Sequence, residues 1–436
     1  MTKPSASVRW RPRRVTGACL LAVALGAAWS ASALADRPAP SIAAGPNLRS
    51  ELTQLVAMRG GPPGAIALVQ RGNRTSVYRA GVSNIRSGSA MDPHWSMRIA
   101  SAAKAFSGAV SLALVNRHWL LLSDTIGKWL PKLPRAWRSV TLGQALGHTS
   151  GLPDFSETKA ISAYVQAHPR ATPPPVFLLR FVAKQRLGFT PGTRYRYSNT
   201  DNIVVALMAE AATHRSYNRL LSSLVFSRLG LRRTSLPAGP GMPKPYIHGY
   251  NLNPPKAPSD VTTVVSAAYA WASGGIVSTP AELNRFIRAY VGARLFSRAV
   301  QRQQFRFVHG ASGPPGPGQN SAGGAIFRYR TRCGTVYGHT GNTLGYTQFM
   351  ASTLDGTRSV VVSVNGQIND MSPQPMLVAY RRLRQIEQDV VCAALRSHAR
   401  ERTSGVISAA GPSGPDSAAP AGSCSPPGWV GLTNDV

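Results

Sequence analysis

The sequence predicts a mixed α/β fold of the α+β type: an antiparallel sheet built from both chain ends and flanked by terminal helices, with an inserted, mostly helical subdomain. Segments with strand-like alternation lie near both ends of the chain, whereas residues 100–290 have mostly helix and loop character. Sequential hairpins imply antiparallel pairing. A length of 436 residues and a hydrophobic content of 43% suit one large two-part domain and exclude a disordered chain.

The N-terminal part of the domain begins with a predicted helix over residues 48–58. Residues 65–70 and 75–80 alternate as two paired strands around a turn at Arg71-Gly72-Asn73. Small and apolar residues dominate 102–115, which is typical of a buried helix. We therefore expect a helix, a hairpin and a buried helix before most of the helical insertion.

The C-terminal part returns to strands and closes with a helix. A segment rich in Gly and Pro over residues 310–324 comes first, and we interpret it as an irregular loop of the kind that often serves as a lid. Residues 373–395 are predicted as the closing helix, because Leu377, Leu383, Ile386 and Val390 fall on one face. The strands between them are expected over residues 326–331, 335–338, 346–352 and 359–364.

The two chain ends are predicted to lie outside this domain, which we place at residues 48–397. Residues 1–35 have the basic start, the apolar core and the A-x-A cleavage site of a signal peptide, so we expect a secreted, extracellular protein. The pair Arg13-Arg14 leaves the twin-arginine export route open. Residues 36–47 are interpreted as a linker and residues 398–436 as a flexible tail rich in Gly, Pro, Ser and Ala.

The chain is strongly basic, with 49 Lys and Arg against 17 Asp and Glu and a formal net charge of +32. Such a charge suits nucleic acid, and equally an anionic polymer such as a bacterial cell wall. No basic helix or aromatic-interleaved patch stands out, so we expect the protein to bind the cell wall and not nucleic acid. We also expect it to be a monomer. No C-x-x-C or His-rich spacing occurs, so we expect no metal and no cofactor.

The first pattern with chemical meaning is Ser101-Ala102-Ala103-Lys104. Residues three apart share one helix face, so the Lys104 amine would lie beside the Ser101 hydroxyl, which is a weak nucleophile until a neighbour takes its proton. The pattern is weak alone, because Ser156-Glu157-Thr158-Lys159 matches it too. The second copy lies in a polar stretch and is interpreted as a helix N-cap. Ser101 opens a helix that looks buried, and we therefore favour Ser101 as the nucleophile.

The second pattern is Tyr197-Ser198-Asn199, which follows a turn. A tyrosine pKa near 10 is about three units too high for a base at neutral pH. An ammonium about 4 Å away would supply roughly 4 kcal/mol at an effective dielectric constant of 20, or about three units. We therefore expect Lys104 beside Tyr197, with one of the two serving as the base, and Asn199 as an amide that holds the substrate. Alone, the pattern also suits a turn tyrosine with a capping Asn.

The third pattern is His339-Thr340-Gly341, between strand-like flanks. Gly341 would let a substrate lie against the strand edge, and the backbone N–H of Asn342 could serve as the second oxyanion donor, beside that of Ser101. Taken alone, this pattern is equally typical of a turn at the end of a strand.

Together the three patterns resemble those of the serine β-lactamase and penicillin-binding-protein superfamily, the class C β-lactamase-like serine hydrolases, with S-x-x-K, Y-x-N and a final K/H-T-G in this order. The resemblance covers roughly residues 48–395. Its further matches are Met97-Arg98-Ile99-Ala100, His148-Thr149-Ser150-Gly151-Leu152, Ala272-Ser273-Gly274-Gly275 and Ser278-Thr279-Pro280. The implied fold is that of the β-lactamase/transpeptidase enzymes, and the implied catalytic residues are Ser101, Lys104 and Tyr197.

Within the superfamily, His339 makes the third motif more similar to that of secreted serine-type D-alanyl-D-alanine carboxypeptidases than to class C β-lactamases, which carry Lys there. The stretch around Cys333 and the late Cys392 also resembles a secreted carboxypeptidase that joins the equivalent cysteines. The resemblance thus implies a disulfide between these two residues, worth roughly 4 kcal/mol in the chain-entropy model. Cys424 would be left unpaired.

The resemblance also implies an arginine that binds the substrate's terminal carboxylate, for which Arg328 is the candidate and Arg330 the alternate. Asn342 departs from the pattern, because these carboxypeptidases often have Thr there, and this puts peptide specificity in question. Trp271 could line the substrate cleft or belong to the core. His148 is expected to be structural.

These features predict acyl transfer through an acyl-enzyme on Ser101, with a D-Ala-D-Ala stem peptide of peptidoglycan as substrate and β-lactams as acylating ligands. An esterase or β-lactamase with the same machinery is the first alternative. A non-catalytic cell-wall-binding protein with the same fold is the second.

Overall fold

The computed structural model describes residues 47–308 and 313–396. The predicted signal peptide, the linker up to residue 46, the tail and Cys424 lie outside the described residues. Within these two ranges no helix combines the length and the apolar character that a membrane span needs.

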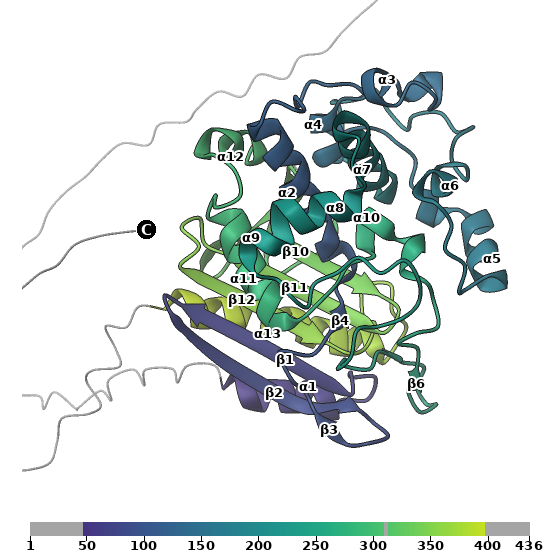
Figure 1. The fold of residues 1–436 in the computed structure, drawn as a ribbon. Coiled ribbons are helices and arrows are strands. Elements are labelled where there is room, and N and C mark those ends of the chain that lie inside the picture. The colour runs from purple at the N-terminus through teal and green to yellow at the C-terminus, as the bar shows by residue number, and fades with distance from the viewer. Residues whose placement is uncertain (1–46, 309–312, 397–436) are drawn as a thin grey trace, which may run out of the picture. The chain divides into compact units, whose positions relative to one another are not determined.

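The centre of the fold is an eight-stranded sheet in the order β3-β2-β1-β12-β11-β10-β9-β8, and each pair of neighbours is antiparallel (Figure 1). The pairing of Ala65 with Val364 joins the N-terminal hairpin to the last strand. The prediction of an antiparallel sheet built from both chain ends is therefore confirmed. The strands are β1 (Gly64–Arg71), β2 (Arg74–Asn84), β3 (Ser89–Ala90), β8 (Gln319–Gly323), β9 (Ile326–Thr331), β10 (Gly334–Thr343), β11 (Tyr346–Ser352) and β12 (Arg358–Val364).

Two terminal helices, α1 (Leu48–Ala57) and α13 (Met376–Leu395), cover one face of this sheet (Figure 1). Alternate residues of β1 point to this face, so that Val69 packs in the same core as Leu52 and Ile386. Every second side chain of the strand faces the helices, and the apolar side chains of each helix lie on the face toward the sheet. These two sets of side chains form the buried layer between them. The predicted flanking helices are confirmed.

The other face of the sheet carries the helical region, whose core includes Ile66 and Leu68 of β1 together with Phe106 of α2. Helix α2 (Ala103–Asn116) is buried almost all round, as its small and apolar residues predict. The other helices are α3 (Ile126–Trp129), α4 (Leu142–Leu146), α5 (Lys159–Ala167), α6 (Pro175–Leu179), α7 (Asn199–Thr213), α8 (Tyr217–Leu221), α9 (Ser227–Leu229), α10 (Trp271–Gly274), α11 (Pro280–Val291) and α12 (Arg298–Gln304). Short strands pair as β4 (Met97–Arg98) with β7 (Val277–Ser278) and β5 (Tyr250–Asn251) with β6 (Ser259–Asp260).

One segment differs from its prediction. The sequence suggested an irregular loop over residues 310–324, but residues 319–323 form the edge strand β8, which pairs with β9 from Gln319↔Arg330 to Gly323↔Ile326. Pairing with a strong neighbouring strand overrides the weak local preference of Gly and Ser for strands.

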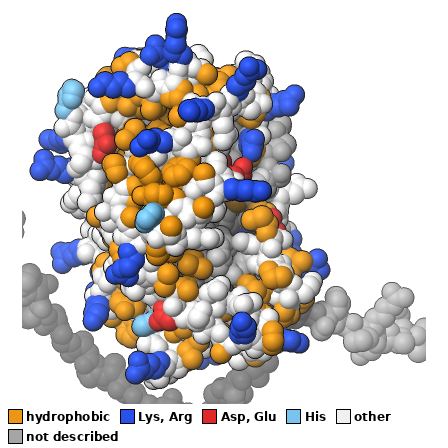
Figure 2. Space-filling model, turned by 90° about the vertical axis from the view of Figure 1, so that its right-hand side faces the viewer, with side chains coloured by type: hydrophobic (Ala, Val, Ile, Leu, Met, Phe, Trp, Pro, Cys, Tyr) orange, Lys and Arg blue, Asp and Glu red, His pale blue; other side chains and the backbone are white. Residues whose placement is uncertain are grey.

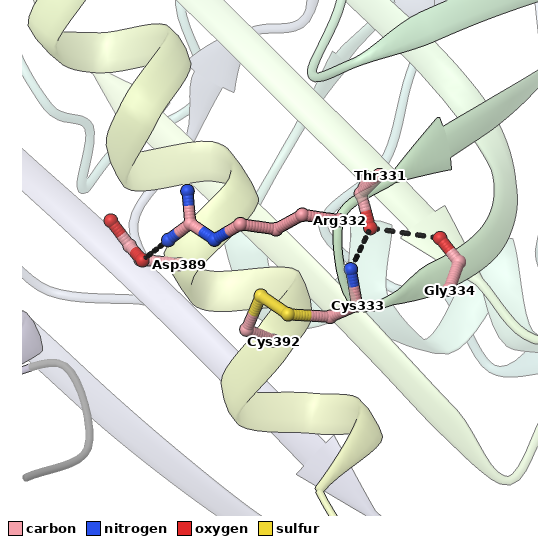
Figure 3. The surroundings of a disulfide bond; sticks show 6 residues. All are labelled: Thr331, Arg332, Cys333, Gly334, Asp389 and Cys392. Carbon is pink, nitrogen blue, oxygen red and sulfur yellow. Dashed lines mark hydrogen bonds and ion pairs between the residues drawn. A yellow bond between two sulfur atoms is a disulfide. The ribbon is translucent and has the colours of Figure 1, made fainter. Parts of the chain in front are cut away.

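A disulfide joins Cys333, in the turn between β9 and β10, to Cys392 of α13, with 5.1 Å between the Cα atoms (Figure 3). This is the pairing that the resemblance implied. Beside it, Arg332 forms an ion pair with Asp389 of the same helix. The two links attach the end of the β9–β10 hairpin to α13.

Candidate active site

Ser101 lies in a single 3₁₀ turn, Ala100–Ala102, that leads directly into α2. Its two neighbours are buried, while Ser101 itself is partly exposed, so the hydroxyl is accessible. Ala100 has φ = +50°, a left-handed conformation that is unfavourable for a residue with a Cβ. Backbone strain of this kind is common where the chain must aim a reactive side chain.

Lys104 lies one turn further along and is completely buried. Its Nζ atom is 3.3 Å from Ser101 Oγ, 2.7 Å from Asn199 Oδ1 and 2.7 Å from the carbonyl oxygen of Ser273. The last two atoms only accept hydrogen bonds. In a neutral amine, the two N–H groups would serve them and the lone pair would face the Ser101 hydroxyl.

Burial lowers the pKa of Lys104 from 10.5 to about 7, although the charge of Asp154 acts in the opposite direction. Removing an ammonium from water disfavours its charged form, and here this effect outweighs the attraction of the carboxylate. A large fraction of Lys104 is therefore neutral near pH 7 and able to accept the Ser101 proton.

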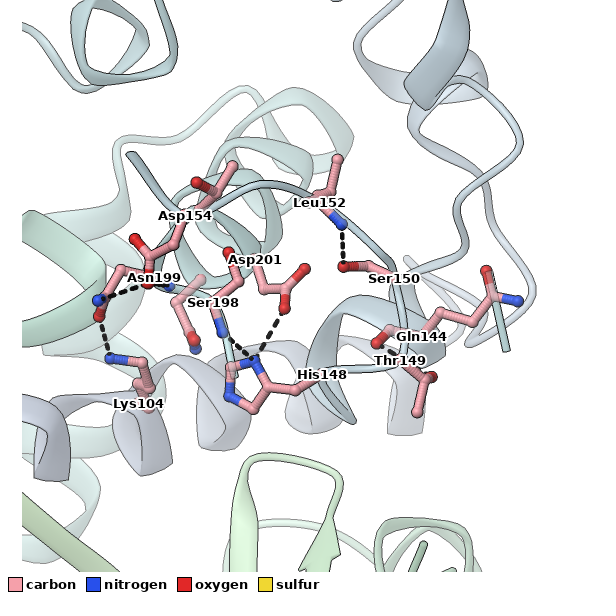
Figure 4. Close-up of polar contacts among 12 residues, drawn as sticks. Lys104, Gln144, His148, Thr149, Ser150, Leu152, Asp154, Ser198, Asn199 and Asp201 are labelled. Atoms are coloured by element: carbon pink, nitrogen blue, oxygen red, sulfur yellow. Dashed lines mark hydrogen bonds and ion pairs between the residues drawn. The ribbon is translucent and has the colours of Figure 1, made fainter. Parts of the chain in front are cut away.

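Asn199 begins α7, and its side chain is held on both sides (Figure 4). Its Oδ1 accepts from Lys104, while its Nδ2 donates to Asp154 Oδ2 at 3.0 Å and to Ser156 Oγ at 2.9 Å. The backbone N–H of Asn199 also donates to Asp154 Oδ2, at 2.9 Å. Asn199 thus positions the Lys104 amine, whereas the sequence suggested that its amide would hold the substrate.

Tyr197 lies beside Lys104, as expected, but the Lys104 Nζ is above the ring, 4.8 Å from its centroid. Burial raises the pKa of Tyr197 well above 10, and the nearby Ser101 side chain opposes this only in part. The sequence left open which of the two groups serves as the base, and the effect of burial on the two pKa values favours Lys104. Tyr197 is a neutral phenol whose hydroxyl has no well-aligned hydrogen bond among the described residues.

His148 packs behind Tyr197, with 4.5 Å between the ring centroids. Its Nδ1 is 2.8 Å from Asp201 Oδ2 and also accepts from the backbone N–H of Ser198 at 3.3 Å (Figure 4). Burial lowers the pKa of His148 to about 3 and raises that of Asp201 well above its usual value, so the pair is neutral. A protonated Asp201 that donates to Nδ1 satisfies both contacts, in keeping with the structural role expected for His148.

The third motif lies on β10, opposite the turn that carries Ser101. A Cβ on Gly341 would be 2.3 Å from the carbonyl oxygen of Ile99 and 3.2 Å from the N atom of Ala102, so only glycine fits. β10 pairs with β9 only as far as Gly338, whereas its pairing with β11 continues to Thr343. The edge of β10 at the motif is thus free of β9.

His339 is completely buried and neutral, since burial lowers its pKa to about 3. Its Nδ1 donates to the carbonyl oxygen of Thr340 at 2.5 Å, and its ring lies 6.5 Å from that of Tyr197. Nε2 is buried and has no hydrogen-bond partner among the described residues. Thr340 itself is buried on the strand beside it.

Asn342 has no hydrogen-bonding capacity left in its side chain. Its Nδ2 donates to Thr347 Oγ1 at 2.9 Å and to the carbonyl oxygen of Ile368 at 2.8 Å. Its Oδ1 accepts from Gln367 at 2.9 Å and from Asn369 at 3.1 Å. The side chain therefore holds the 367–369 loop, and only the backbone of Asn342 remains for a ligand.

Two further candidates make contacts away from the catalytic group. The guanidinium of Arg328 stacks on Phe307, 4.6 Å from the ring centroid, and donates to Ser321 at 3.4 Å. Trp271, at φ = +35°, packs edge-on against Tyr217 with 5.1 Å between the centroids. These contacts are packing contacts within the protein, and they do not show that Arg328 or Trp271 binds a substrate.

Sequence reasoning missed two groups that hold Lys104. Asp154 anchors Asn199, and the carbonyl oxygen of Ser273 accepts from Lys104. Asp154 comes two residues after the segment that ends at Leu152, and this position next to a recognised motif was the available signal. A backbone carbonyl leaves no signal in the sequence.

Comparison with known proteins places this geometry in a family. The family model described as Beta-lactamase matches residues 48–383. A penicillin-binding protein of Bacillus subtilis (strain 168) is 23% identical over 291 residues, which cover 64% of this chain and 63% of that protein. The match thus spans less than two thirds of that relative's length.

Two solved structures share the fold. A D-stereospecific amidohydrolase from Streptomyces sp. is 28% identical, with 73% of this chain and 94% of that chain covered and a TM-score of 0.65. A D-amino acid amidase from Ochrobactrum anthropi SV3 is 21% identical, with 79% and 98% covered and a TM-score of 0.69. The family match extends from the first helix to the closing one and includes all three motifs, and the chain therefore belongs to the Beta-lactamase family of serine hydrolases.

Proposed function

We propose that the protein is an exported D-alanyl-D-alanine carboxypeptidase, which cleaves peptidoglycan stem peptides through an acyl-enzyme on Ser101. One observation carries the proposal. A buried Lys104 amine, held by Asn199 and the Ser273 carbonyl at 2.7 Å each, lies 3.3 Å from the Ser101 hydroxyl. The export of the protein rests on the signal-peptide pattern of residues 1–35.

Acylation begins when neutral Lys104 takes the Ser101 proton and Oγ attacks the carbonyl carbon of the substrate. The negative charge on the carbonyl oxygen is held by the backbone N–H groups of Ser101 and Asn342. The free edge of β10 and the absence of a side chain at Gly341 support this placement of the substrate.

Expulsion of the leaving group needs a proton on its nitrogen. Tyr197, a neutral phenol, gives its proton to that nitrogen and receives one from the Lys104 ammonium, which returns the amine to its neutral form. The C–N bond breaks, and an ester between Ser101 and the acyl group remains. A water molecule, deprotonated by the same groups, then hydrolyses the ester and restores Ser101.

The charge of the chain supports a substrate in an anionic wall. A net charge of +27 remains when the five basic residues of residues 1–35 are taken from +32. Such a charge favours association with anionic polymers and with a peptide that ends in a carboxylate.

A D-amino acid amidase is the second candidate, and Asn342 favours it. Its side chain is fully used inside the protein, and the guanidinium of Arg328 on the neighbouring strand β9 stacks on Phe307, so the Asn342 side chain cannot take the place of a carboxylate-binding Thr. The 28% identical Streptomyces structure is of a D-stereospecific amidohydrolase. An esterase or β-lactamase would need the same Ser101 chemistry and differs only in its acyl donor.

The test is to label the purified protein with a fluorescent penicillin and to locate the modified residue by mass spectrometry. We expect label on Ser101, none in Ser101→Ala, and full label in the control variant Ser162→Ala, which changes an exposed serine of α5. Label that persists in Ser101→Ala would overturn the proposed nucleophile. Absence of label with intact binding to purified cell wall would support the non-catalytic alternative.

The substrate is tested separately on diacetyl-L-Lys-D-Ala-D-Ala and on D-phenylalanine amide. Release of D-alanine from the peptide supports the carboxypeptidase. Release of ammonia from the amide alone supports the amidase. If the protein releases neither D-alanine nor ammonia but hydrolyses nitrocefin or short acyl esters, the result supports the esterase or β-lactamase.

A further inference from the structure

On the face drawn in Figure 2, Lys and Arg side chains are spread over the surface, whereas Asp and Glu are sparse. An exposed arginine by itself therefore marks no site in this protein. A pocket of about 430 Å³ between the β1–β2 hairpin and α11 differs, because Arg285, Arg288 and Arg294 all line it. None of its lining residues is an acid, and none belongs to the catalytic group.

Backbone carbonyl groups hold two of these guanidinium groups in place. Arg285 and Arg288 are three residues apart on α11 and so share one helix face. Arg285 Nη1 donates to the carbonyl of Gly230 at 2.8 Å. Arg288 donates to the carbonyls of Gly356 at 2.8 Å and Gly72 at 3.1 Å. Carbonyl acceptors fix the position of these groups but leave the positive charge without a counterion.

Arg294 comes from the turn after α11, where its backbone N–H donates to the carbonyl of Ala289 at 2.9 Å. Arg294 lines the same pocket as Arg288, and burial and the charge of Arg294 lower the pKa of Arg288. Among the described residues, none of the three arginines forms an ion pair.

The acids beside the pocket have other partners. Glu282, next to the lining residue Ala281, accepts from the backbone N–H of Arg233 at 3.0 Å and from Thr234 Oγ1 at 2.6 Å. Asp92 accepts from the backbone N–H of His94 at 2.7 Å. Asp355 accepts from Thr353 and Thr357. Among the described residues, none of these three carboxylates forms an ion pair with the three guanidinium groups.

The inner wall of the pocket is polar and rigid. Gln70 and Asn284 are 3% and 6% exposed, and Asn284 Nδ2 donates to Gln70 Oε1 at 3.1 Å. Gln70 Nε2 donates to the Gly72 carbonyl at 2.8 Å, and Ser359 donates to Asn284 Oδ1 at 2.6 Å. Because these amides satisfy each other, the wall is fixed before any ligand arrives.

We propose that this pocket is an anion site that binds the phosphate groups of an anionic polymer and so attaches the enzyme to its surroundings. Guanidinium groups match phosphate oxygens in bidentate geometry and lose less hydration than ammonium groups. Three neighbouring cations without a counterion repel one another, and a multiply charged oxyanion relieves that repulsion. The site is independent of the Ser101 reaction.

The test measures binding of fluorescein-labelled polyphosphate by anisotropy at 150 mM salt. The variant Arg285→Gln/Arg288→Gln/Arg294→Gln is compared with Arg49→Gln/Arg86→Gln/Arg302→Gln, which removes the same charge from exposed positions elsewhere. We expect at least tenfold weaker binding in the first variant, about 1.4 kcal/mol, and less than a twofold change in the second. Penicillin labelling of Ser101 should be equal in both.

Equal loss of binding in the two variants would overturn the proposal, because net charge alone would then explain the affinity. Competition by polyglutamate as strong as that by unlabelled polyphosphate would also overturn it, since carboxylates would then serve equally well. Displacement by millimolar inorganic phosphate would identify a single phosphate group as the ligand, and resistance to it would identify the polymer. Thermal melting of both variants checks that each is folded.

Discussion

Two segments of this protein share the S-x-x-K pattern and have different surroundings. In the first, Lys104 is completely buried and lies 3.3 Å from Ser101. In the second, Ser156 and Lys159 are both exposed. The same four-residue pattern is thus compatible with a catalytic pair and with a surface turn, and burial of the amine separates the two.

The second copy is nevertheless connected to the first. Ser156 Oγ accepts from Asn199 Nδ2 at 2.9 Å, and Asn199 in turn holds Lys104. The sequence suggested that this copy is a helix N-cap, and its third residue, Thr158, does cap α5, while Asp154 just before the copy caps the 3₁₀ turn. Ser156 therefore supports the active site, which its position in a polar stretch did not reveal.

The largest expected difference between the two copies comes from removing each amine. Lys104→Met should reduce the rate of penicillin acylation by about 10³, because a general base typically contributes 10²–10⁴. Lys159→Met should change the rate by less than twofold. Stopped-flow acylation kinetics measure both, with circular dichroism to confirm folding. If Lys104→Met is acylated at a rate within tenfold of that of the natural protein, the first copy is no more catalytic than the second.

The next effect concerns the strand that faces Ser101. Gly341→Ala should reduce acylation by about 10², because the new Cβ would be 2.3 Å from the Ile99 carbonyl and the turn carrying Ser101 must shift. Gly241→Ala is the matched control, since no atom lies within 4 Å of its added Cβ. Labelling rates for the two variants test the idea, and equal rates would contradict it.

The pH dependence should follow the protonation of Lys104. With its pKa lowered to about 7, the acylation rate should rise roughly tenfold between pH 6 and pH 8, as the amine becomes neutral. The charge of Asp154 raises that pKa, so Asp154→Asn should move the rise to lower pH. An unchanged or higher midpoint in this variant would argue against Lys104 as the titrating base.

The smallest effect is expected at the second copy. Ser156→Ala removes one of the two acceptors for Asn199 Nδ2, while Asp154 remains. The loss of one hydrogen bond of about 1 kcal/mol predicts a roughly fivefold slower acylation. Ser162→Ala, on the exposed surface of the adjacent helix, is the control and should leave the rate unchanged. Identical rates in the two variants would mean that Ser156 contributes nothing to the site.

Much of the fold was predictable because the hydrophobic period is a local property of the chain. It identified the hairpin of β1 and β2, the strands β9 to β12 and the two covering helices. The edge strand β8 was missed, since Gly and Ser carry little strand preference and only the pairing with β9 makes Gln319–Gly323 extended.

The sequence predicted which residues form the candidate site, but it did not predict their protonation or their hydrogen-bond partners. Ser101, Lys104 and Tyr197 do come together, but which of Lys104 and Tyr197 is the base could not be predicted, because burial, which raises the pKa of Tyr197, cannot be judged from spacing. The side-chain partners of Asn199 and Asn342 could not be predicted either, since their hydrogen bonds go to residues distant along the chain.

The sequence by itself determined the order of the three motifs, the alternation of the strands and the excess of positive charge, because each depends only on which residues occur and at what spacing. Tertiary structure decided which serine has a buried amine beside it, which side chains were already used in internal contacts, and where three arginines line one pocket that has no acid among its described lining residues. Those outcomes depend on hydration and on distances between remote segments, and both arise only when the chain packs.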